Sequence, residues 1–196
     1  MKNTTNLYAV YACLVAATLW GLYWIPLRYL ENSGISGLWA SVLIYSVSFF
    51  FIFPRFFKLR ADFYASKTLY ILLAIFAGWT NLAFVLALLE GEVVRVMILF
   101  YLSPVWATLL AFFILNEKLK KRNIMALVLA IVGVFLISWH PGIEFTKSFD
   151  RADFYAVTSG VAFAISNILV RKIGGLSHSV KMCSAWFGVM VLAGCG

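Results

Sequence analysis

One aromatic and one polar side chain lie deep in a long apolar run, and side chains of these two types could bind a small molecule. Trp79 and Asn81 fall in the middle of the run from 68 to 89. An amide at such depth normally bonds a neighbouring helix or faces a cavity. Both interpretations of Asn81 stay open, and the second would supply hydrogen bonding and stacking to a ligand.

A second set of candidates surrounds a proline in the next apolar run. Tyr101 and Ser103 lie just before Pro104 in the sequence. Pro104 has no N–H to donate to the carbonyl of Phe100. A freed carbonyl inside a membrane must face protein or water. The sequence therefore predicts an interrupted helix here, either as a packing kink or as part of a ligand site.

The first and sixth apolar runs contribute the remaining candidates. Trp20 and Trp24 stand one helical turn apart, near Pro26, and Asn167 lies in the sixth run. Aromatic residues are common at membrane interfaces, so an interfacial position for Trp24 stays open beside a cavity position. We group these residues with the first two sets as candidates for a cavity lining.

Catalytic and metal-binding patterns are absent from the sequence. It contains no HExxH, no Gly-x-Ser-x-Gly and no glycine-rich phosphate loop. Cys13, Cys183 and Cys195 lack the spacing of disulfides or metal ligands. We expect no enzyme activity, no cofactor and no metal, and because no carboxylate is expected to be buried in the spans, proton coupling has no candidate.

The composition places these residues in a lipid bilayer. Apolar residues make up 63% of the 196 residues and charged residues only 12%, against about 45–50% and 25% in soluble domains. A span needs about 20 apolar residues, and six runs approach or exceed this length while a seventh stops short. The runs are 7–27, 36–53, 68–89, 93–115, 123–139, 154–170 and 182–196.

The basic residues predict the orientation of these spans. With the N-terminus inside, 12 of the 16 Lys and Arg residues fall in cytoplasmic segments and only Arg28, Arg95, Lys147 and Arg151 fall outside. This asymmetry satisfies the positive-inside rule. The net charge of +8 is therefore explained by topology, and we expect no nucleic-acid partner.

The tight turn between the third and fourth runs concentrates charge. Glu90 and Glu92 precede Arg95, which lies in the first turn of the next helix. A solvated loop in which Glu92 favours the helix N-terminus is one interpretation. The other is an external gate, in which Arg95 pairs with one of these acids when the outer side closes.

The first and sixth runs resemble each other after a shift of 143 residues, which superimposes Arg171 on Arg28. The same shift aligns two stripes of small residues that predict close helix packing, and it aligns Ser41 weakly with Ser184. The stripes are Cys13, Ala17 and Gly21, and Ala156, Gly160 and Ala164. A copy that begins after five spans enters with opposite orientation, as in inverted-repeat transporters.

The stretch "LSPVWATLLAFFILNEKLKKRNIMALVLAIVGVFLI" resembles the end of the repeat in the drug/metabolite transporter superfamily, EamA-type branch. The similarity rests on Pro104, on Glu117 followed by Lys118, and on Gly133, together with "LWG…R" in the first run. The resemblance implies an all-α integral membrane protein built from two five-helix repeats. The expected division is 1–139 as the first repeat, 140–152 as an external loop and 153–196 as the truncated start of an inverted second repeat.

These observations predict a multi-pass protein with six or seven of an expected ten transmembrane helices. The resemblance implies a secondary permease or exporter of small metabolites, such as amino acids or related compounds, in a bacterial inner membrane. Its partners would be the lipid bilayer and a small-molecule substrate, and a homodimer or a pairing with a full-length relative stays open. The alternative function is a truncated, transport-inactive protein that acts structurally or through such pairing.

Overall fold

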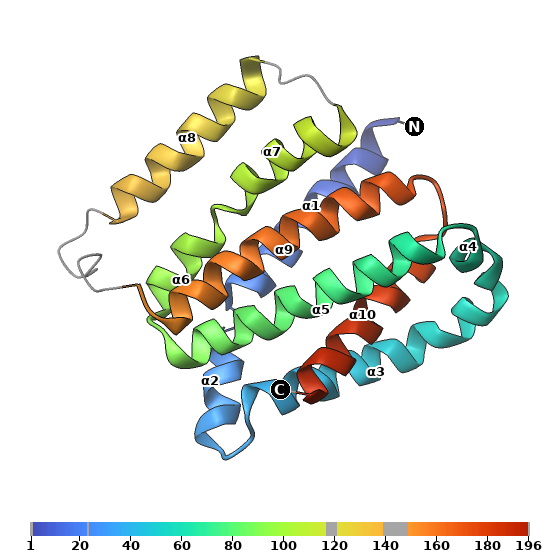
Figure 1. Cartoon of the computed structure of the whole chain (residues 1–196), viewed down its shortest axis with the longest axis horizontal. Coiled ribbons are helices and arrows are strands. Elements are labelled where there is room, and N and C mark those ends of the chain that lie inside the picture. Colours follow the sequence, from blue (N-terminus) through green and yellow to red (C-terminus); the bar gives the residue numbers. More distant parts are fainter. Residues whose placement is uncertain (1, 23, 117–120, 139–148, 196) are drawn as a thin grey trace.

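The computed structural model describes residues 2–22, 24–116, 121–138 and 149–195. These residues form ten α-helices and no strand, in the arrangement of Figure 1. The helices are α1 (Lys2–Leu22), α2 (Trp24–Asn32), α3 (Gly37–Lys58), α4 (Arg60–Ala65), α5 (Lys67–Glu90), α6 (Val93–Phe100), α7 (Ser103–Leu115), α8 (Lys121–Ser138), α9 (Arg151–Ile173) and α10 (His178–Cys195).

The helices follow the apolar runs. Five helical segments of the described residues are long and apolar enough to cross a membrane. They are Val10–Asn32, Gly37–Lys58, Lys67–Glu90, Val93–Leu115 and Arg151–Ile173. α8 and α10 occupy the other two predicted runs, so the prediction of an all-α membrane protein is confirmed. Most of the predicted external loop 140–152 lies outside the described residues.

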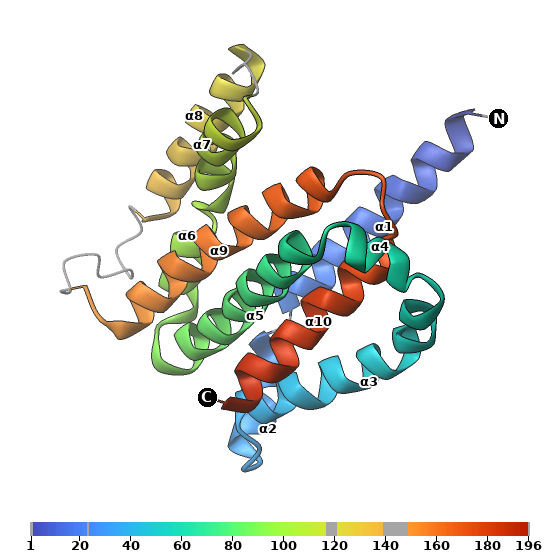
Figure 2. The ribbon, with the colours of Figure 1, turned by 45° about the vertical axis from the view of Figure 1, so that its right-hand side comes forward.

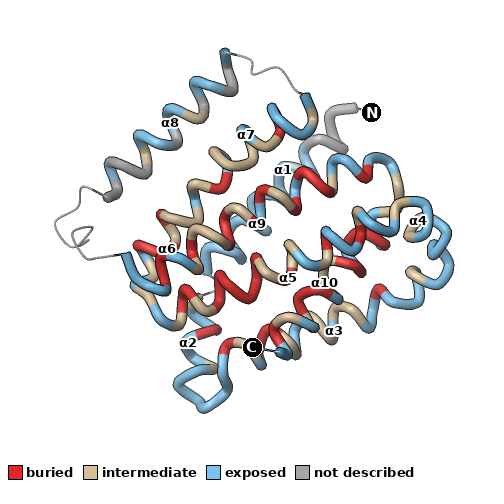
Figure 3. Tube along the Cα trace, in the orientation of Figure 1, coloured by how far each residue is buried: buried red, intermediate tan, exposed pale blue. Residues whose placement is uncertain are grey.

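α5 is the central helix of the fold. It packs along α9 on one side and along α10 on the other, while α3 packs against α10 (Figures 1 and 2). Buried residues are concentrated on α5, α9 and α10, whereas α1 and α8 are largely exposed (Figure 3). Two apolar clusters lie along α5, one around Val85 and Leu88 and the other around Tyr70 and Leu73.

Glycine permits the close approach of α5 and α10. A Cβ atom added at Gly188 would overlap the backbone of Ala74, and one added at Gly78 would overlap the carbonyl of Gly188. Without side chains between them, the two backbones can make extensive van der Waals contact, which is a major source of helix association in lipid. The α5–α10 crossing therefore depends on these two glycines.

The small-residue stripe predicted in the sixth run also lies at helix contacts. Ala156, Gly160 and Ala164 of α9 are all buried, so close packing of this helix is confirmed. The corresponding prediction for α1 is wrong in this structure, because its stripe is exposed and no atom lies within 4 Å of a Cβ added at Gly21. The stripe on α1 has no helix beside it among the described residues.

The proline-containing run is interrupted as predicted. α6 ends at Phe100, α7 begins at Ser103, and Pro104 occupies the first turn of α7. The Phe100 carbonyl, which Pro104 cannot engage, faces α9: a Cβ added at Gly160 would lie 3.2 Å from its oxygen. In the first run, Pro26 lies in the first turn of α2.

Side chains stabilise both ends of α9. At its start the Asp150 carboxylate accepts a hydrogen bond from the N–H of Asp153, and the Asp153 carboxylate accepts one from the N–H of Asp150, which forms a capping box. At its end the Lys181 ammonium donates to the carbonyls of Val170 and Gly174. Both sets of partners satisfy backbone groups that the helix itself leaves unpaired.

We predict that Gly188→Leu destabilises the fold through the α5–α10 crossing. The added side chain would overlap the α5 backbone, and overpacking of this kind costs about 1–3 kcal/mol or more. The measurement is the melting temperature in detergent, followed by fluorescence-detected size exclusion. Gly194→Leu on the same helix is the control, because no atom lies within 4 Å of its added Cβ. Equal melting temperatures for the two variants would contradict the prediction.

Candidate functional site

A cavity of about 220 Å³ lies between helices beside the middle of α5 and opens to the surface at Trp20 and Asn167, and we call it the central cavity. It lies where six helices meet, between the two apolar clusters along α5. Its lining comprises Trp20 of α1, Tyr45 of α3, Leu73, Ala77, Thr80, Asn81 and Phe84 of α5, Phe100 of α6, Phe163, Ser166, Asn167 and Val170 of α9, and Ala185, Trp186 and Val189 of α10.

Asn81 makes a hydrogen bond between two helices that line this cavity. Its Nδ2 donates to the hydroxyl of Tyr45 at 3.2 Å, which joins α5 to α3. Its Oδ1 is buried and has no hydrogen-bond partner among the described residues. A buried acceptor without a partner is energetically costly. Asn81 thus bonds a neighbouring helix, which was one of its two predicted roles. It also retains an unused acceptor.

Three further polar side chains of the lining donate within their own helices. The Thr80 hydroxyl donates to the carbonyl of Phe76, the Ser166 hydroxyl to that of Ala162, and Asn167 Nδ2 to that of Phe163. A hydroxyl that has given its hydrogen to the backbone can still accept through its oxygen. These three side chains and Asn81 therefore present acceptor oxygens to the central cavity.

Aromatic rings form much of the remaining wall. Trp20 and Phe84 meet edge to face with centroids 6.2 Å apart, and Phe84 and Phe100 lie 4.8 Å apart. Phe100 in turn lies 5.5 Å from Phe163. None of the lining side chains is a carboxylate, ammonium, guanidinium or imidazole. The cavity is therefore uncharged, with aromatic faces beside a few hydrogen-bond acceptors.

The structure brings together three of the predicted cavity residues and separates the others from them. Trp20, Asn81 and Asn167 line the central cavity, although they come from α1, α5 and α9. The remaining candidates are not in the lining: Trp24 packs against the apolar cluster around Val85, Trp79 is half-buried, Ser103 is buried near Gly160, and Tyr101 and Pro104 are exposed. Substrate contact by any of these residues stays a prediction.

The sequence reasoning missed Tyr45 and Trp186. Both line the central cavity, and Tyr45 is the partner of Asn81. The criterion that selected Asn81, a polar or aromatic side chain far from the ends of an apolar run, also fits Tyr45 in the run 36–53. Trp186 lies near the start of the short final run, where depth in the membrane could not be judged from sequence.

A buried ion pair joins α6 to α9 beyond the end of α5. Arg95 Nε donates to Oδ1 of Asp153 at 2.7 Å, and Arg95 Nη2 donates to Oδ2 at 2.5 Å. The expectation that no carboxylate is buried in the spans is therefore wrong, since Asp153 is only 2% exposed. It lies in the first turn of α9, and hydropathy alone assigned that turn to the outer loop.

The predicted external gate is not tested by this arrangement. Glu90 and Glu92 are exposed at the turn between α5 and α6, and Glu92 is the residue before α6. Arg95 is committed to Asp153 in this conformation. Pairing of Arg95 with either glutamate in another conformation stays a prediction.

No group of three or more His, Cys, Asp or Glu residues that could hold a metal ion occurs in the part of the chain that the structure describes. The arrangement at the central cavity is suited to noncovalent binding by stacking and hydrogen bonding.

The fold and the cavity define a multi-pass, all-helical membrane protein. Residues 7–139 match the EamA-like transporter family. Because this match spans more than half of the chain, the chain belongs to that family, and the resemblance inferred from the sequence is confirmed. Neither the curated proteins nor the solved structures contain a match to the chain.

We predict that Asp153→Ala destabilises the protein much more than Asp150→Ala. Removing Asp153 leaves a buried guanidinium without its carboxylate, and such losses cost about 3–5 kcal/mol. Removing Asp150 deletes a helix cap that contributes about 1 kcal/mol. Melting temperatures in detergent compare the two variants. In Arg95→Leu/Asp153→Leu neither charge remains, so this double variant should be more stable than Asp153→Ala. The opposite order would show that loss of the ion pair is not what destabilises Asp153→Ala.

Proposed function

We propose that this protein is a secondary permease that moves small metabolites through a site at the central cavity. Membership of a transporter family supports a transport function. The single observation that carries the location is the meeting of Trp20, Asn81 and Asn167 at one cavity between helices. The sequence contains no glycine-rich ATP-binding loop, so concentrative transport would draw on an ion gradient or on exchange.

The chemistry of the lining narrows the substrate class. A molecule with a net charge would lose its hydration without gaining a counter-charge from the lining, which is costly. A net-neutral molecule that carries N–H or O–H donors could bond the acceptors of Asn81, Ser166 and Thr80. Its apolar or aromatic part could stack on rings such as Phe100. Neutral amino acids and related compounds have these features, and their carboxylate could accept from a lining donor such as the indole N–H of Trp186.

The directions of α3 and α10 support the proposal that the chain contains the start of an inverted second repeat. α3 ends beside α4, and α10 begins beside α4, where the N–H of Ser177 donates to Asp62 at 3.0 Å. The two helices that the 143-residue shift aligns therefore run in opposite directions while packing together. Opposite orientation of corresponding helices is the plan of inverted-repeat transporters, in which the substrate site lies between repeats.

We predict that Asn81→Ala and Trp20→Ala each reduce transport at least several-fold. The loss of one hydrogen bond or stacking contact of about 1.4 kcal/mol corresponds to a tenfold change in binding. The measurement is uptake of radiolabelled neutral amino acids into proteoliposomes. Trp39→Ala is the matched control for Trp20→Ala, because Trp39 is an exposed tryptophan of α3 that lies outside the lining.

Two results would contradict this assignment. If Trp39→Ala reduces transport as much as Trp20→Ala at equal membrane abundance, the site does not coincide with the central cavity. If Asn81→Ala lowers abundance and transport in parallel, Asn81 acts only by joining α5 to α3. A wild-type chain that inserts and folds yet moves no labelled substrate would favour the alternative of a transport-inactive protein.

We also propose that the N-terminus is cytoplasmic. α4, the end of α9 and the start of α1 lie toward one end of the bundle, and α2 and the α5–α6 turn lie toward the other (Figures 1 and 2). The first end carries basic side chains and the second carries most of the acids. The basic residues are Arg55, Lys58, Arg60, Lys67, Arg171 and Lys172, and the acids are Glu31, Glu90, Glu92, Asp150 and Asp153.

A reporter fused at Asp62 is expected to be cytoplasmic, and one fused at Lys147 external. Positively charged loops are retained inside during insertion. The assay compares a fluorescent reporter that requires the cytoplasm with a phosphatase that requires the external side. A third fusion at Gly34, in the turn between α2 and α3, should agree with Lys147. Finding the Asp62 and Lys147 fusions on the same side would overturn this topology.

A further inference from the structure

A cluster of four basic residues surrounds α4 at one end of the bundle, and we call it the basic corner. It comprises Arg55 and Lys58 in the last turn of α3, Arg60 at the start of α4 and Lys67 at the start of α5. All four are exposed. Among the described residues, none has an ion-pair partner.

Two apolar cavities begin beside this corner. One, of about 260 Å³, runs between α5 and α10 from Phe63 and Tyr70 to Leu192. The other, of about 230 Å³, runs between α3 and α10 from Phe63 to Phe49. They share Phe63, Ser184 and Phe187, so they adjoin each other along α10 and both extend away from α4.

The cavities are open to the outer surface of the bundle. Ile75, Phe187 and Val191 line them and are about half exposed. The wall near α4 is aromatic, with Phe53, Phe56, Phe63 and Tyr70 in a continuous series of ring contacts. The buried hydroxyl of Tyr70 has no hydrogen-bond partner among the described residues. An apolar chain from the bilayer could enter both cavities from the side.

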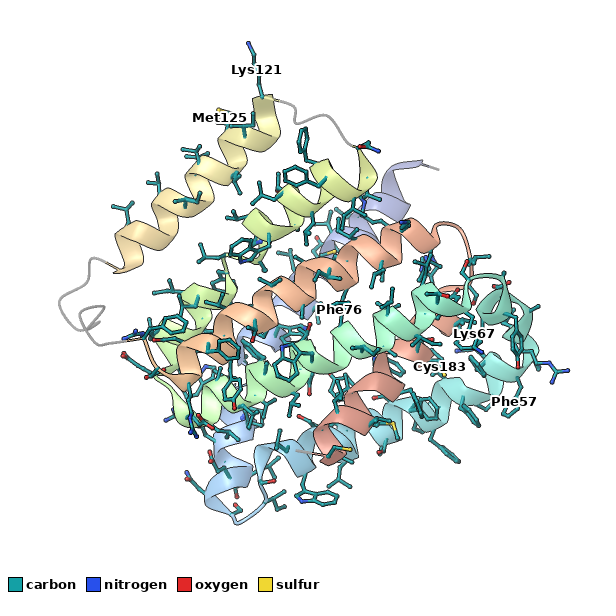
Figure 4. The ribbon with its side chains drawn as sticks, viewed as in Figure 1. Phe57, Lys67, Phe76, Lys121, Met125 and Cys183 are labelled. Carbon is teal, nitrogen blue, oxygen red and sulfur yellow. The ribbon has the colours of Figure 1, made fainter. Side chains whose placement is uncertain are left out.

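Helix register aligns two of the cations with the cavity entrances. Lys67 is one turn before Tyr70 and Ile71 on α5, and Arg60 is one turn before Phe63 on α4, so each cation shares a helix face with lining residues. Figure 4 shows Lys67 and Cys183, which lines the second cavity, at the same end of the molecule. Lys121 lies far from them, at the start of α8.

The one acid of this segment does not cancel its charge. Asp62 accepts a hydrogen bond from the N–H of Ser177, which ties α4 to the turn between α9 and α10. Four cations and this single acid leave the segment from Arg55 to Lys67 positively charged. Basic pockets between membrane helices attract anionic lipid headgroups.

We propose that the basic corner and the two apolar cavities together form a binding site for one anionic phospholipid of the bilayer. Arg60 and Lys67 bind the headgroup phosphate, and Arg55 and Lys58 add to the positive potential. The two acyl chains lie in the two cavities on either side of Phe187. Occupancy would link α3, α4, α5 and α10, and this site is separate from the central cavity.

The experiment is native mass spectrometry of the whole chain released from detergent micelles. Dioleoyl phosphatidylglycerol and dioleoyl phosphatidylcholine are titrated in parallel, because they share acyl chains and differ in net charge. We expect phosphatidylglycerol to bind about tenfold or more tightly than phosphatidylcholine, because each Lys or Arg beside an anionic headgroup strengthens binding about several-fold. Arg60→Gln/Lys67→Gln should remove most of that preference.

The control variant, Arg28→Gln/Lys121→Gln, removes the same number of exposed charges elsewhere and should keep the preference. Ile75→Trp, at a position that is 50% exposed, should narrow one cavity and weaken both lipids several-fold without changing their ratio. If it impairs folding by size exclusion, Val191→Trp replaces it. Equal binding of the two lipids by the wild type, equal loss in the control variant, or unchanged binding with a narrowed cavity would each overturn the proposal.

Discussion

Close contact between helix backbones is the constraint on which the rest of this structure depends. Lipid offers little hydrophobic drive for one apolar helix to bind another, so association relies on tight packing and hydrogen bonds. Gly78 and Gly188 bring α5 against α10, and Gly160 brings α9 against the break between α6 and α7. Because α9 and α10 both pack along α5, the side chains between these helices are fixed in position, and the central cavity lies among them.

The interruption between α6 and α7 shows how a local defect is accommodated by a distant residue. Pro104 leaves the Phe100 carbonyl without its usual donor, and an unpaired carbonyl in lipid would be costly. Gly160 allows that part of the backbone to approach α9 closely. Phe100 is thereby placed with its ring between Phe84 and Phe163 in the cavity wall. The break therefore contributes to the site through Phe100, whereas Tyr101 and Pro104 remain exposed.

Polar contacts organise the two ends of α9 in different ways. At one end the carboxylate of Asp153 serves both the capping box and Arg95 of α6. At the other end the Lys181 ammonium donates to two backbone carbonyls, and these bonds stabilise the sharp turn into α10. Asp62 of α4 bonds the same turn. These few buried or half-buried charges orient helices whose remaining contacts are apolar and nondirectional.

Hydropathy, proline and loop charge act within a few residues along the chain. For that reason the amino-acid sequence was enough to predict which segments are membrane helices, where Pro104 interrupts one, and how basic charge is distributed. It also indicated that Asn81 would meet a helix or a cavity. The folded chain was needed to show that Tyr45 is its partner and that Asp153 pairs with Arg95. It was also needed to show that the small residues of α9 are packed while those of α1 are exposed. Those outcomes depend on how each helix is rotated about its axis and crosses its neighbours, and that is set by contacts between distant residues such as Gly78 and Gly188.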